Sequence, residues 1–249
     1  MGRGDGIPAF FALACGLTWL LDTPLVWAWT HHREPAAWAL ALAGLSAFGP
    51  TLAAVALAAP RGELGLVFGR WRANPLWVVL ALFTPMFLHF PATMLDALLG
   101  GEPAQWLYLP DKPERILALV FFSIGEEFGW RGFAQPRMAA RFGPVRGSLL
   151  LGMVWALWHA MMVFTPAGAI DWQGAAFLVI TLPLWSVVMA WFLARGGGSL
   201  AVAIALHAGG HLDNNSLAPA SAVQLRVLTV LVLAVASGLA ARSLARDRG

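Results

Sequence analysis

The sequence predicts an all-α fold, a polytopic bundle of membrane helices. Hydrophobic residues make up 59% of the 249-residue chain and charged residues only 12%, and the mean hydropathy is +0.70. Ordinary soluble domains contain about a quarter charged residues. Apolar runs long enough to span a bilayer, roughly 20 residues each, follow one another along nearly the whole chain. We therefore expect one integral membrane domain over residues 1–249, with no sizeable soluble domain.

About eight transmembrane helices are expected, joined by short loops. Their predicted ranges are 7–29, 36–59, 75–99, 113–130, 147–164, 172–194, 199–212 and 221–241. The first range is long, rich in Trp and followed by further spans, which favours a membrane helix over a cleaved signal peptide. Pro113 suits the opening turn of the fourth helix. The stretch "ARFGPVRG", residues 140–147, predicts a short turn at the membrane interface.

The arginines predict that both termini lie in the cytoplasm. With Arg131 set aside, eleven basic residues fall in the segments that this orientation places inside and four in those that it places outside. The net charge of +3 is modest, so the pI near 10.0 reflects topology and gives no reason to expect a nucleic-acid partner. The high Ala, Gly and Arg content indicates a bacterial source, hence a multi-pass protein of the inner (plasma) membrane. The single cysteine, Cys15, excludes an intrachain disulfide.

Two adjacent carboxylates and an arginine interrupt the apolar sequence at "FSIGEEFGWRGF". A charged side chain at the centre of a lipid-facing helix costs about 2.5 to 3.5 kcal/mol on insertion scales, so these groups must face protein, water or a counterion. Glu127 and Arg131 are four residues apart and can pair on one helix face, whereas Glu126 points about 100° away. We expect Arg131 to neutralise Glu127 and Glu126 to be free to bind a water. The alternative is a purely structural charge cluster.

A histidine in the next predicted helix offers a partner for such a water. In "WALWHAMMVF", Trp155 precedes His159 by one turn and Trp158 adjoins it. Histidine can share a water with a carboxylate and exchange protons near neutral pH. The alternative is a hydrogen-bonded core histidine surrounded by packing tryptophans.

The third polar group is "ALHAGGHLDNN", which places His207 and His211 on one helix face, with Asn215 another turn on. Two histidines at this spacing can bind a metal, although the zinc-protease pattern H-E-x-x-H is absent. The same side chains could instead stabilise an oxyanion. Gly209 and Gly210 would let a neighbouring helix or a substrate backbone come close.

In order and context, these three clusters resemble the CPBP family of intramembrane proteases. This family includes the type II CAAX prenyl endopeptidases and bacterial bacteriocin-processing or immunity proteins. Its first motif, E-E-x-x-x-R, corresponds to Glu126, Glu127 and Arg131, and the adjoining "GFAQPRM" is also similar to the family. Its second motif, F-x-x-x-H, corresponds to Trp155 and His159, with Trp in place of Phe.

The third family motif, H-x-x-x-N or H-x-x-x-D, fits in two registers. Either His207 is followed by His211 in the place of Asn, or His211 is followed by Asn215; we prefer the first because "GGSLAVAIALHA" resembles the family's approach to its histidine. The resemblance predicts a catalytic core over residues 113–215 and covers the first three helices only by hydropathy.

The resemblance implies that a glutamate and a histidine activate water without a covalent intermediate. Transferred to this sequence, it makes Glu126 and His159 the base and its partner, His207 and His211 the oxyanion donors, and Glu127 and Arg131 the supporting pair. The two glutamates could exchange roles. Trp155, Trp158 and Asn215 are the candidates for contact with substrate.

The predicted function is an intramembrane endopeptidase that cuts a membrane-associated protein or peptide, at a site reachable from the cytoplasmic half. This mechanism requires no cofactor, although some family members have been described as metalloproteases and zinc on His159, His207 and His211 is an alternative. A second alternative is a non-catalytic bacteriocin-immunity or scaffold protein in the bilayer. A third is a proton-coupled transporter, which is disfavoured because the sequence has no convincing repeat.

Overall fold

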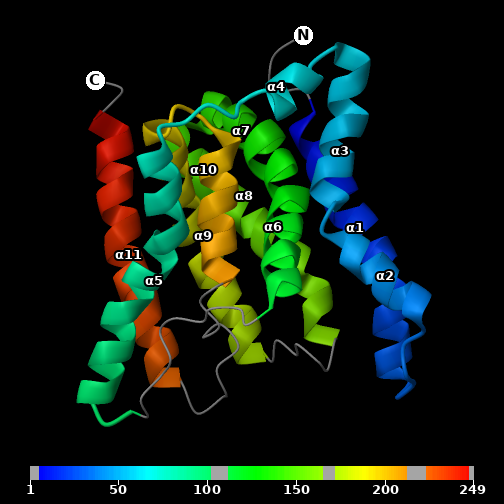
Figure 1. The fold of residues 1–249 in the computed structure, drawn as a ribbon, viewed down its shortest axis with the longest axis horizontal. Coiled ribbons are helices and arrows are strands. Elements are labelled where there is room, and N and C mark those ends of the chain that lie inside the picture. Colours follow the sequence, from blue (N-terminus) through cyan, green and yellow to red (C-terminus); the bar gives the residue numbers. More distant parts are fainter. Residues whose placement is uncertain (1–5, 102–111, 165–171, 212–222, 247–249) are drawn as a thin grey trace.

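The computed structural model describes residues 6–101, 112–164, 172–211 and 223–246. Every regular element in these ranges is helical, which confirms the all-α class. Figure 1 shows the long helices running between two opposite edges of the molecule.

The elements match the predicted spans closely, with additional short helices between them. In chain order they are α1 (Ile7–Thr30), α2 (Ala37–Ser46), α3 (Gly49–Ala58), η1 (Ala59–Arg61), α4 (Leu64–Phe68), α5 (Pro75–Leu98), α6 (Pro113–Glu127), η2 (Phe128–Ala134), α7 (Gln135–Phe142), α8 (Pro144–Trp158), η3 (His159–Phe164), α9 (Trp172–Arg195), α10 (Leu200–His211) and α11 (Val223–Arg246).

Five helices within the described ranges are long and apolar enough to cross a membrane, or six if α2 and α3 form one bent span. The chain is therefore an integral membrane protein. The two other predicted spans are helical but shorter, since α6 has 15 residues and α10 has 12. The predicted total of eight stays a prediction.

The predicted span 36–59 is broken, and the break brings the chain close to α6. Helices α2 and α3 bend by 57° where they meet. Helix α3 begins at Gly49, and its second residue, Pro50, has no N–H to donate. A Cβ atom added at Gly129 would lie 2.4 Å from the Pro50 backbone, so only glycine allows this contact. Thr51 adds a hydrogen bond of 2.6 Å to the Gly125 carbonyl oxygen.

The predicted turn over 140–147 is wrong except at one residue. Helix α7 runs to Phe142 and α8 begins at Pro144, so Gly143 alone separates them. Gly143 has φ 83°, a conformation that glycine adopts without steric cost.

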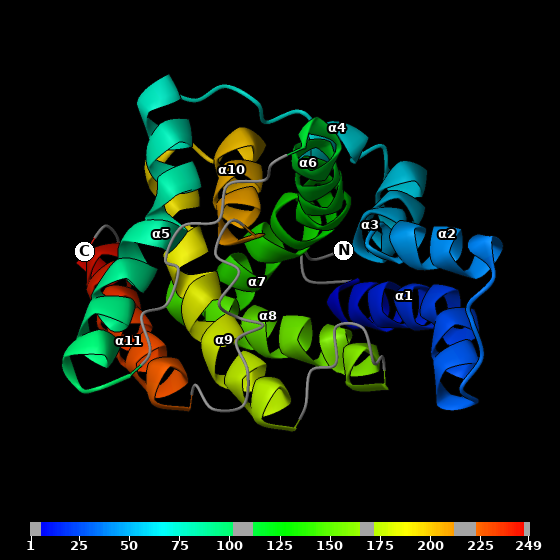
Figure 2. The same ribbon diagram turned by 60° about the horizontal axis from the view of Figure 1, so that its bottom comes forward.

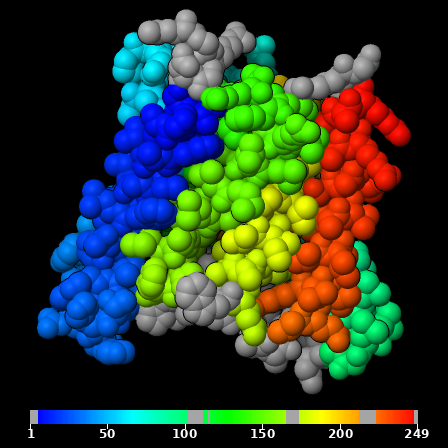
Figure 3. All heavy atoms as spheres, turned by 180° about the vertical axis from the view of Figure 1, so that it is seen from behind, coloured from blue at the N-terminus to red at the C-terminus, as the bar shows by residue number. Residues whose placement is uncertain are grey.

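The helices fall into two groups on either side of a central set of segments. Figure 2 shows α1, α2 and α3 on one side, α5, α9, α10 and α11 on the other, and α6, α7 and α8 between them. Seen from behind in Figure 3, α1, α8, α9 and α11 make up most of the visible face. In Figure 1, α4, α7 and the C-terminal end of α11 lie along the same edge. The sequence assigns the arginines of this edge to the cytoplasm, and that orientation stays a prediction.

Candidate functional site

The first polar motif lies where α6 changes into a wider helix. The structure ends the α-helix at Glu127, and Phe128–Ala134 form the π-helical segment η2. At its end the Gln135 N–H bonds to the Trp130 carbonyl oxygen, five residues back. Wide turns of this kind are frequent at functional sites. The sequence predicted one continuous helix to residue 130 and gave no sign of this change.

Glu127 and Arg131 form the predicted ion pair. The Arg131 Nη1 donates to Glu127 Oε1 at 3.0 Å, and both side chains are fully buried. The second guanidinium nitrogen, Nη2, lies 2.8 Å from the sulfur of Met189 on α9. The guanidinium also sits 4.5 Å from the centre of the Trp155 ring. Arg131 is thus held from three sides, and α6, α8 and α9 are joined through it.

Glu126 makes fewer polar contacts than Glu127, but one of its two oxygens is hydrogen-bonded. Its Oε2 accepts a hydrogen bond of 2.9 Å from the Trp155 indole N–H. Its other oxygen, Oε1, is 3.8 Å from His207 Nε2, beyond hydrogen-bond distance. Glu126 therefore keeps one oxygen available, whereas the sequence predicted the whole carboxylate to be available.

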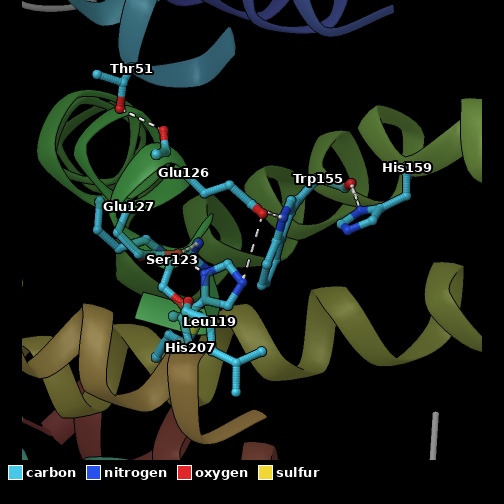
Figure 4. A network of polar contacts seen from close by, with 11 residues as sticks. Thr51, Leu119, Ser123, Glu126, Glu127, Trp155, His159 and His207 are labelled. Carbon is cyan, nitrogen blue, oxygen red and sulfur yellow. Dashed lines mark hydrogen bonds and ion pairs between the residues drawn. The ribbon is translucent and has the colours of Figure 1, made fainter. Parts of the chain in front are cut away.

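His207 lies between the two glutamates (Figure 4). Its Nδ1 is 2.8 Å from Glu127 Oε1, and its Nε2 faces Glu126. The ring also packs edge-on against Trp155, with 5.4 Å between ring centres. Because Nδ1 points at a carboxylate, only Nε2 can serve the oxyanion that the sequence assigned to His207.

His159 lies on the other side of Trp155 from Glu126, at the start of η3 (Figure 4). Its Nδ1 is 2.8 Å from the Trp155 carbonyl oxygen. A carbonyl can only accept, so Nδ1 carries the hydrogen and Nε2 of the neutral ring is an acceptor. The ring is half-buried and therefore more accessible than either glutamate.

Trp158 ties the site to α1, which the sequence placed only by hydropathy. Its indole N–H donates to Thr18 Oγ1 at 2.7 Å, and the Thr18 hydroxyl donates to the Ser46 carbonyl oxygen at 2.7 Å. Trp19 donates to the Trp158 carbonyl oxygen at 3.1 Å. The Trp158 ring in turn packs edge-on against His159 at 4.7 Å. Both Trp158 and Trp155 are buried, and the proposed substrate contact of each stays a prediction.

His211 marks the open end of the site. It is exposed, and its ring stacks on that of His207 with 5.0 Å between centres. The third residue of this predicted group, Asn215, lies outside the described residues.

The glycines beside His211 differ in their surroundings. A Cβ atom added at Gly209 would lie 2.0 Å from the Leu82 carbonyl oxygen of α5, which confirms the predicted close approach. At Gly210 a Cβ atom would meet nothing within 4 Å, so no described helix packs closely there, and the approach of a substrate backbone stays a prediction.

The histidines were also candidates for a metal site, and metal binding by them stays a prediction. Among the residues that the structure describes, no three His, Cys, Asp or Glu side chains are grouped to hold a metal ion. One nitrogen of His207 faces a carboxylate, one of His159 bonds to a carbonyl oxygen, and the rings of His207 and His211 stack. A metal site would need converging lone pairs instead.

Two supporting residues carried no signal in the sequence. Met189 lies in the apolar run "SVVMAWF", and Thr18 is an isolated hydroxyl in the first helix. Each becomes important only because a distant helix places a donor next to it. Neither periodicity nor motif spacing reports such a contact.

Comparison with known proteins adds independent support for the motif segment. Residues 109–212 match the family described as "Type II CAAX prenyl endopeptidase Rce1-like". The chain is also similar to "CAAX prenyl protease 2" of Methanococcus maripaludis, with 26% identity over 170 residues. That similarity covers 61% of this chain and 62% of the relative, so the chain matches less than two thirds of its relative's length. The chain therefore carries an Rce1-like segment at residues 109–212, and the resemblance to the type II CAAX prenyl endopeptidases that its motifs predicted is confirmed.

Proposed function

We propose that this protein is an intramembrane endopeptidase that hydrolyses a peptide bond by means of an activated water. One observation carries the proposal: within the Rce1-like segment, two buried glutamates, Glu126 and Glu127, meet His207 at their carboxylates inside an apolar helix bundle. Buried ionisable groups in membrane helices are costly and usually functional.

Glu126 is the proposed general base. Trp155 holds its Oε2, so Oε1 is left to accept a proton from water. His159 is the proposed second partner of that water, because its Nε2 is an acceptor once Nδ1 is bound to the Trp155 carbonyl oxygen. One residue, Trp155, thus orients both proposed partners of the water, Glu126 through its indole N–H and His159 through its backbone carbonyl oxygen.

The next step is attack of the water on the peptide carbonyl carbon. The water proton passes to Glu126, which later returns it to the departing amine, so no covalent intermediate is formed. The oxyanion is stabilised by donors on α10: His207 through Nε2–H, and His211 at the exposed end of the same helix. For His207 this requires the doubly protonated ring, whose positive charge would face Glu127 and Glu126. Arg131 balances the charge of Glu127.

The proposed substrate is a membrane-associated protein or peptide. The name of the Methanococcus relative points to prenylated C-terminal CAAX sequences. The Ala-, Gly- and Arg-rich composition favours a bacterial protein of the inner membrane, where peptide leaders and tails of membrane proteins are the better candidates. The proposed mechanism uses no metal.

The test compares Glu126→Gln with a matched control on the same helix. Glu114→Gln makes the same chemical change at an exposed position of α6. Each full-length protein, purified in lipid nanodiscs, is incubated with a peptide library that includes prenylated CAAX peptides. We expect Glu126→Gln to lower turnover about 10²- to 10⁴-fold, the usual contribution of a general base, and Glu114→Gln to leave it unchanged.

The outcome also separates the rival functions. Wild-type protein that cleaves no peptide, together with a Glu126→Gln variant that keeps its function in cells, would overturn the protease proposal in favour of a scaffold or immunity protein. If wild type is active, crosslinking the Glu126→Gln variant in its native cells identifies the substrate that stays bound.

A further inference from the structure

The loop between α4 and α5 holds the two halves of the proposed site together through one residue, Arg70. Its Nη2 donates to the carbonyl oxygens of Arg131 and Gly132, at 3.0 and 3.1 Å. Both carbonyls belong to η2, which also carries the side chain that pairs with Glu127. Arg70 therefore contacts the backbone of the segment whose side chains form the buried ion pair.

The sequence explains why the Arg131 carbonyl oxygen needs an outside donor. The Gln135 N–H bonds to the Trp130 carbonyl oxygen, five residues back, which is the π-helical pattern. If that pattern continued, the N–H of residue 136 would bond to the Arg131 carbonyl oxygen. The next residue is Pro136, which has no N–H. An unpaired carbonyl buried in a membrane protein is costly. The Arg70 guanidinium supplies the donor that Pro136 removes.

A second arginine extends the same pattern. Arg137 Nη1 donates to the Phe133 carbonyl oxygen at 2.9 Å, and its Nη2 pairs with Glu63, just before α4. Three consecutive carbonyls of η2 thus receive arginine N–H groups. Burial lowers the pKa of the Arg70 guanidinium, and the nearby charge of Arg137 lowers it further. An arginine nevertheless stays protonated at physiological pH.

The backbone of Arg70 makes the other half of the connection. Its carbonyl oxygen accepts a hydrogen bond of 2.7 Å from the Leu200 N–H, the first residue of α10. The first N–H groups of a helix have no partner within the helix, so this bond fixes where α10 begins. Helix α10 carries His207, which contacts both glutamates.

We infer that Arg70 is a positioning residue that sets the distance between the Glu127–Arg131 pair and His207. Its side chain fixes η2, and its backbone fixes α10. The consequence for catalysis rests on the proposed function, whereas the structural connection does not. Arg70 touches neither substrate nor the reacting water in this scheme.

The experiment uses Arg70→Ala, Arg70→Lys and a matched control, Arg72→Ala, which removes an exposed arginine from the same loop. Each full-length protein in nanodiscs is examined by hydrogen–deuterium exchange and by steady-state kinetics. We expect exchange in residues 128–135 to rise about tenfold in Arg70→Ala, as for the loss of one net hydrogen bond. We expect kcat to fall on the order of 10²-fold, as for a misplaced catalytic group, with KM unchanged.

Arg70→Lys should lie between wild type and Arg70→Ala, because an ammonium lacks the planar fork of the guanidinium. It also serves as the test if Arg70→Ala does not fold. Arg72→Ala should match wild type in both measurements.

The exchange measurement tests the structural connection, and the kinetic measurement tests the positioning role. Unchanged exchange in both Arg70 variants would overturn the structural connection. Raised exchange with an unchanged kcat would overturn the positioning role. If wild-type protein cleaves no peptide, the proposed function fails, and the exchange data still decide whether Arg70 holds η2.

Discussion

The two ends of the candidate site differ in how tightly their groups are held. At the inner end, Glu127, Arg131 and Met189 are almost fully buried, and Arg131 contacts the other two. At the outer end, His159 is half-buried and His211 is exposed. His207 touches both ends, since one of its nitrogens faces Glu127 and its ring stacks on His211.

The same difference separates the two adjacent glutamates, Glu126 and Glu127, along the lines that their spacing to Arg131 predicts. Glu127 Oε1 has two charged or polar partners at hydrogen-bond distance, whereas Glu126 is held by one indole. A carboxylate tied to a buried guanidinium is suited to hold helices in place. A carboxylate with an available oxygen is suited to accept a proton. The Glu127–Arg131 pair should therefore govern stability and Glu126 should govern turnover.

The largest expected effect on stability comes from breaking the inner end. Arg131→Ala leaves Glu127 buried without its counterion, and losing one partner of a buried pair costs about 3–5 kcal/mol. The measurement is reversible unfolding in detergent. The control is Arg141→Ala, an exposed arginine on α7. Equal stability of the two variants would contradict the prediction.

A paired replacement sharpens this test. Glu127→Leu together with Arg131→Met removes both charges and keeps similar volumes, and such replacements are often neutral for stability. We expect the double variant to recover most of the lost free energy of unfolding.

A smaller effect is expected where α10 packs against α5. Gly209→Ala places a methyl group 2.0 Å from the Leu82 carbonyl oxygen, and overpacking of this kind costs about 1–3 kcal/mol. Turnover should fall as well, because α10 carries His207. Gly210→Ala is the matched control, since its methyl group meets nothing within 4 Å and alanine favours a helix over glycine by about 1 kcal/mol. A destabilised Gly210→Ala, or an unaffected Gly209→Ala, would show that the packing is different.

The smallest effect is expected at the exposed outer end. His211→Asn should change the free energy of unfolding by no more than about 0.5 kcal/mol, as is usual for surface positions. Elemental analysis should find bound metal well below one ion per chain in both proteins, and a chelator should leave turnover unchanged. Stoichiometric metal in wild type that disappears in His211→Asn would instead favour the metal alternative.

Much of the fold can be predicted from local sequence, and its breaks cannot. The predicted ranges 75–99 and 172–194 agree with α5 and α9 to within one residue at each end. The bend between α2 and α3 was missed because hydropathy continues unbroken through it. The π-helical turns after Glu127 were missed as well; there Gly129 and Gly132 pack closely against Pro50 and Val67. Such contacts come from distant parts of the chain.

The candidate site was predictable as a set of residues and less so as a geometry. Motif spacing identified Glu127 and Arg131 as a pair, and the structure contains that pair. It offered Trp155 as a packing residue or a substrate contact, whereas the indole N–H of Trp155 binds Glu126. A donor on one helix and an acceptor on another have no fixed spacing in sequence, so only the packed helices bring them together.

The π-helical segment η2 also determines the helical phase of α7. Each residue advances an α-helix by about 100°, so a π turn, which holds one residue more than an α turn, shifts the face that every later residue presents. Gln135, at the start of α7, is buried against Ser148 of α8 at 2.8 Å. Without the extra residue, α6 and α7 could not direct the glutamates and Gln135 to their present partners at the same time. The extra residue thus lets the continuous helical segment from α6 to α7 point the glutamates at one set of partners and Gln135 at another, although the two sets require different helix faces.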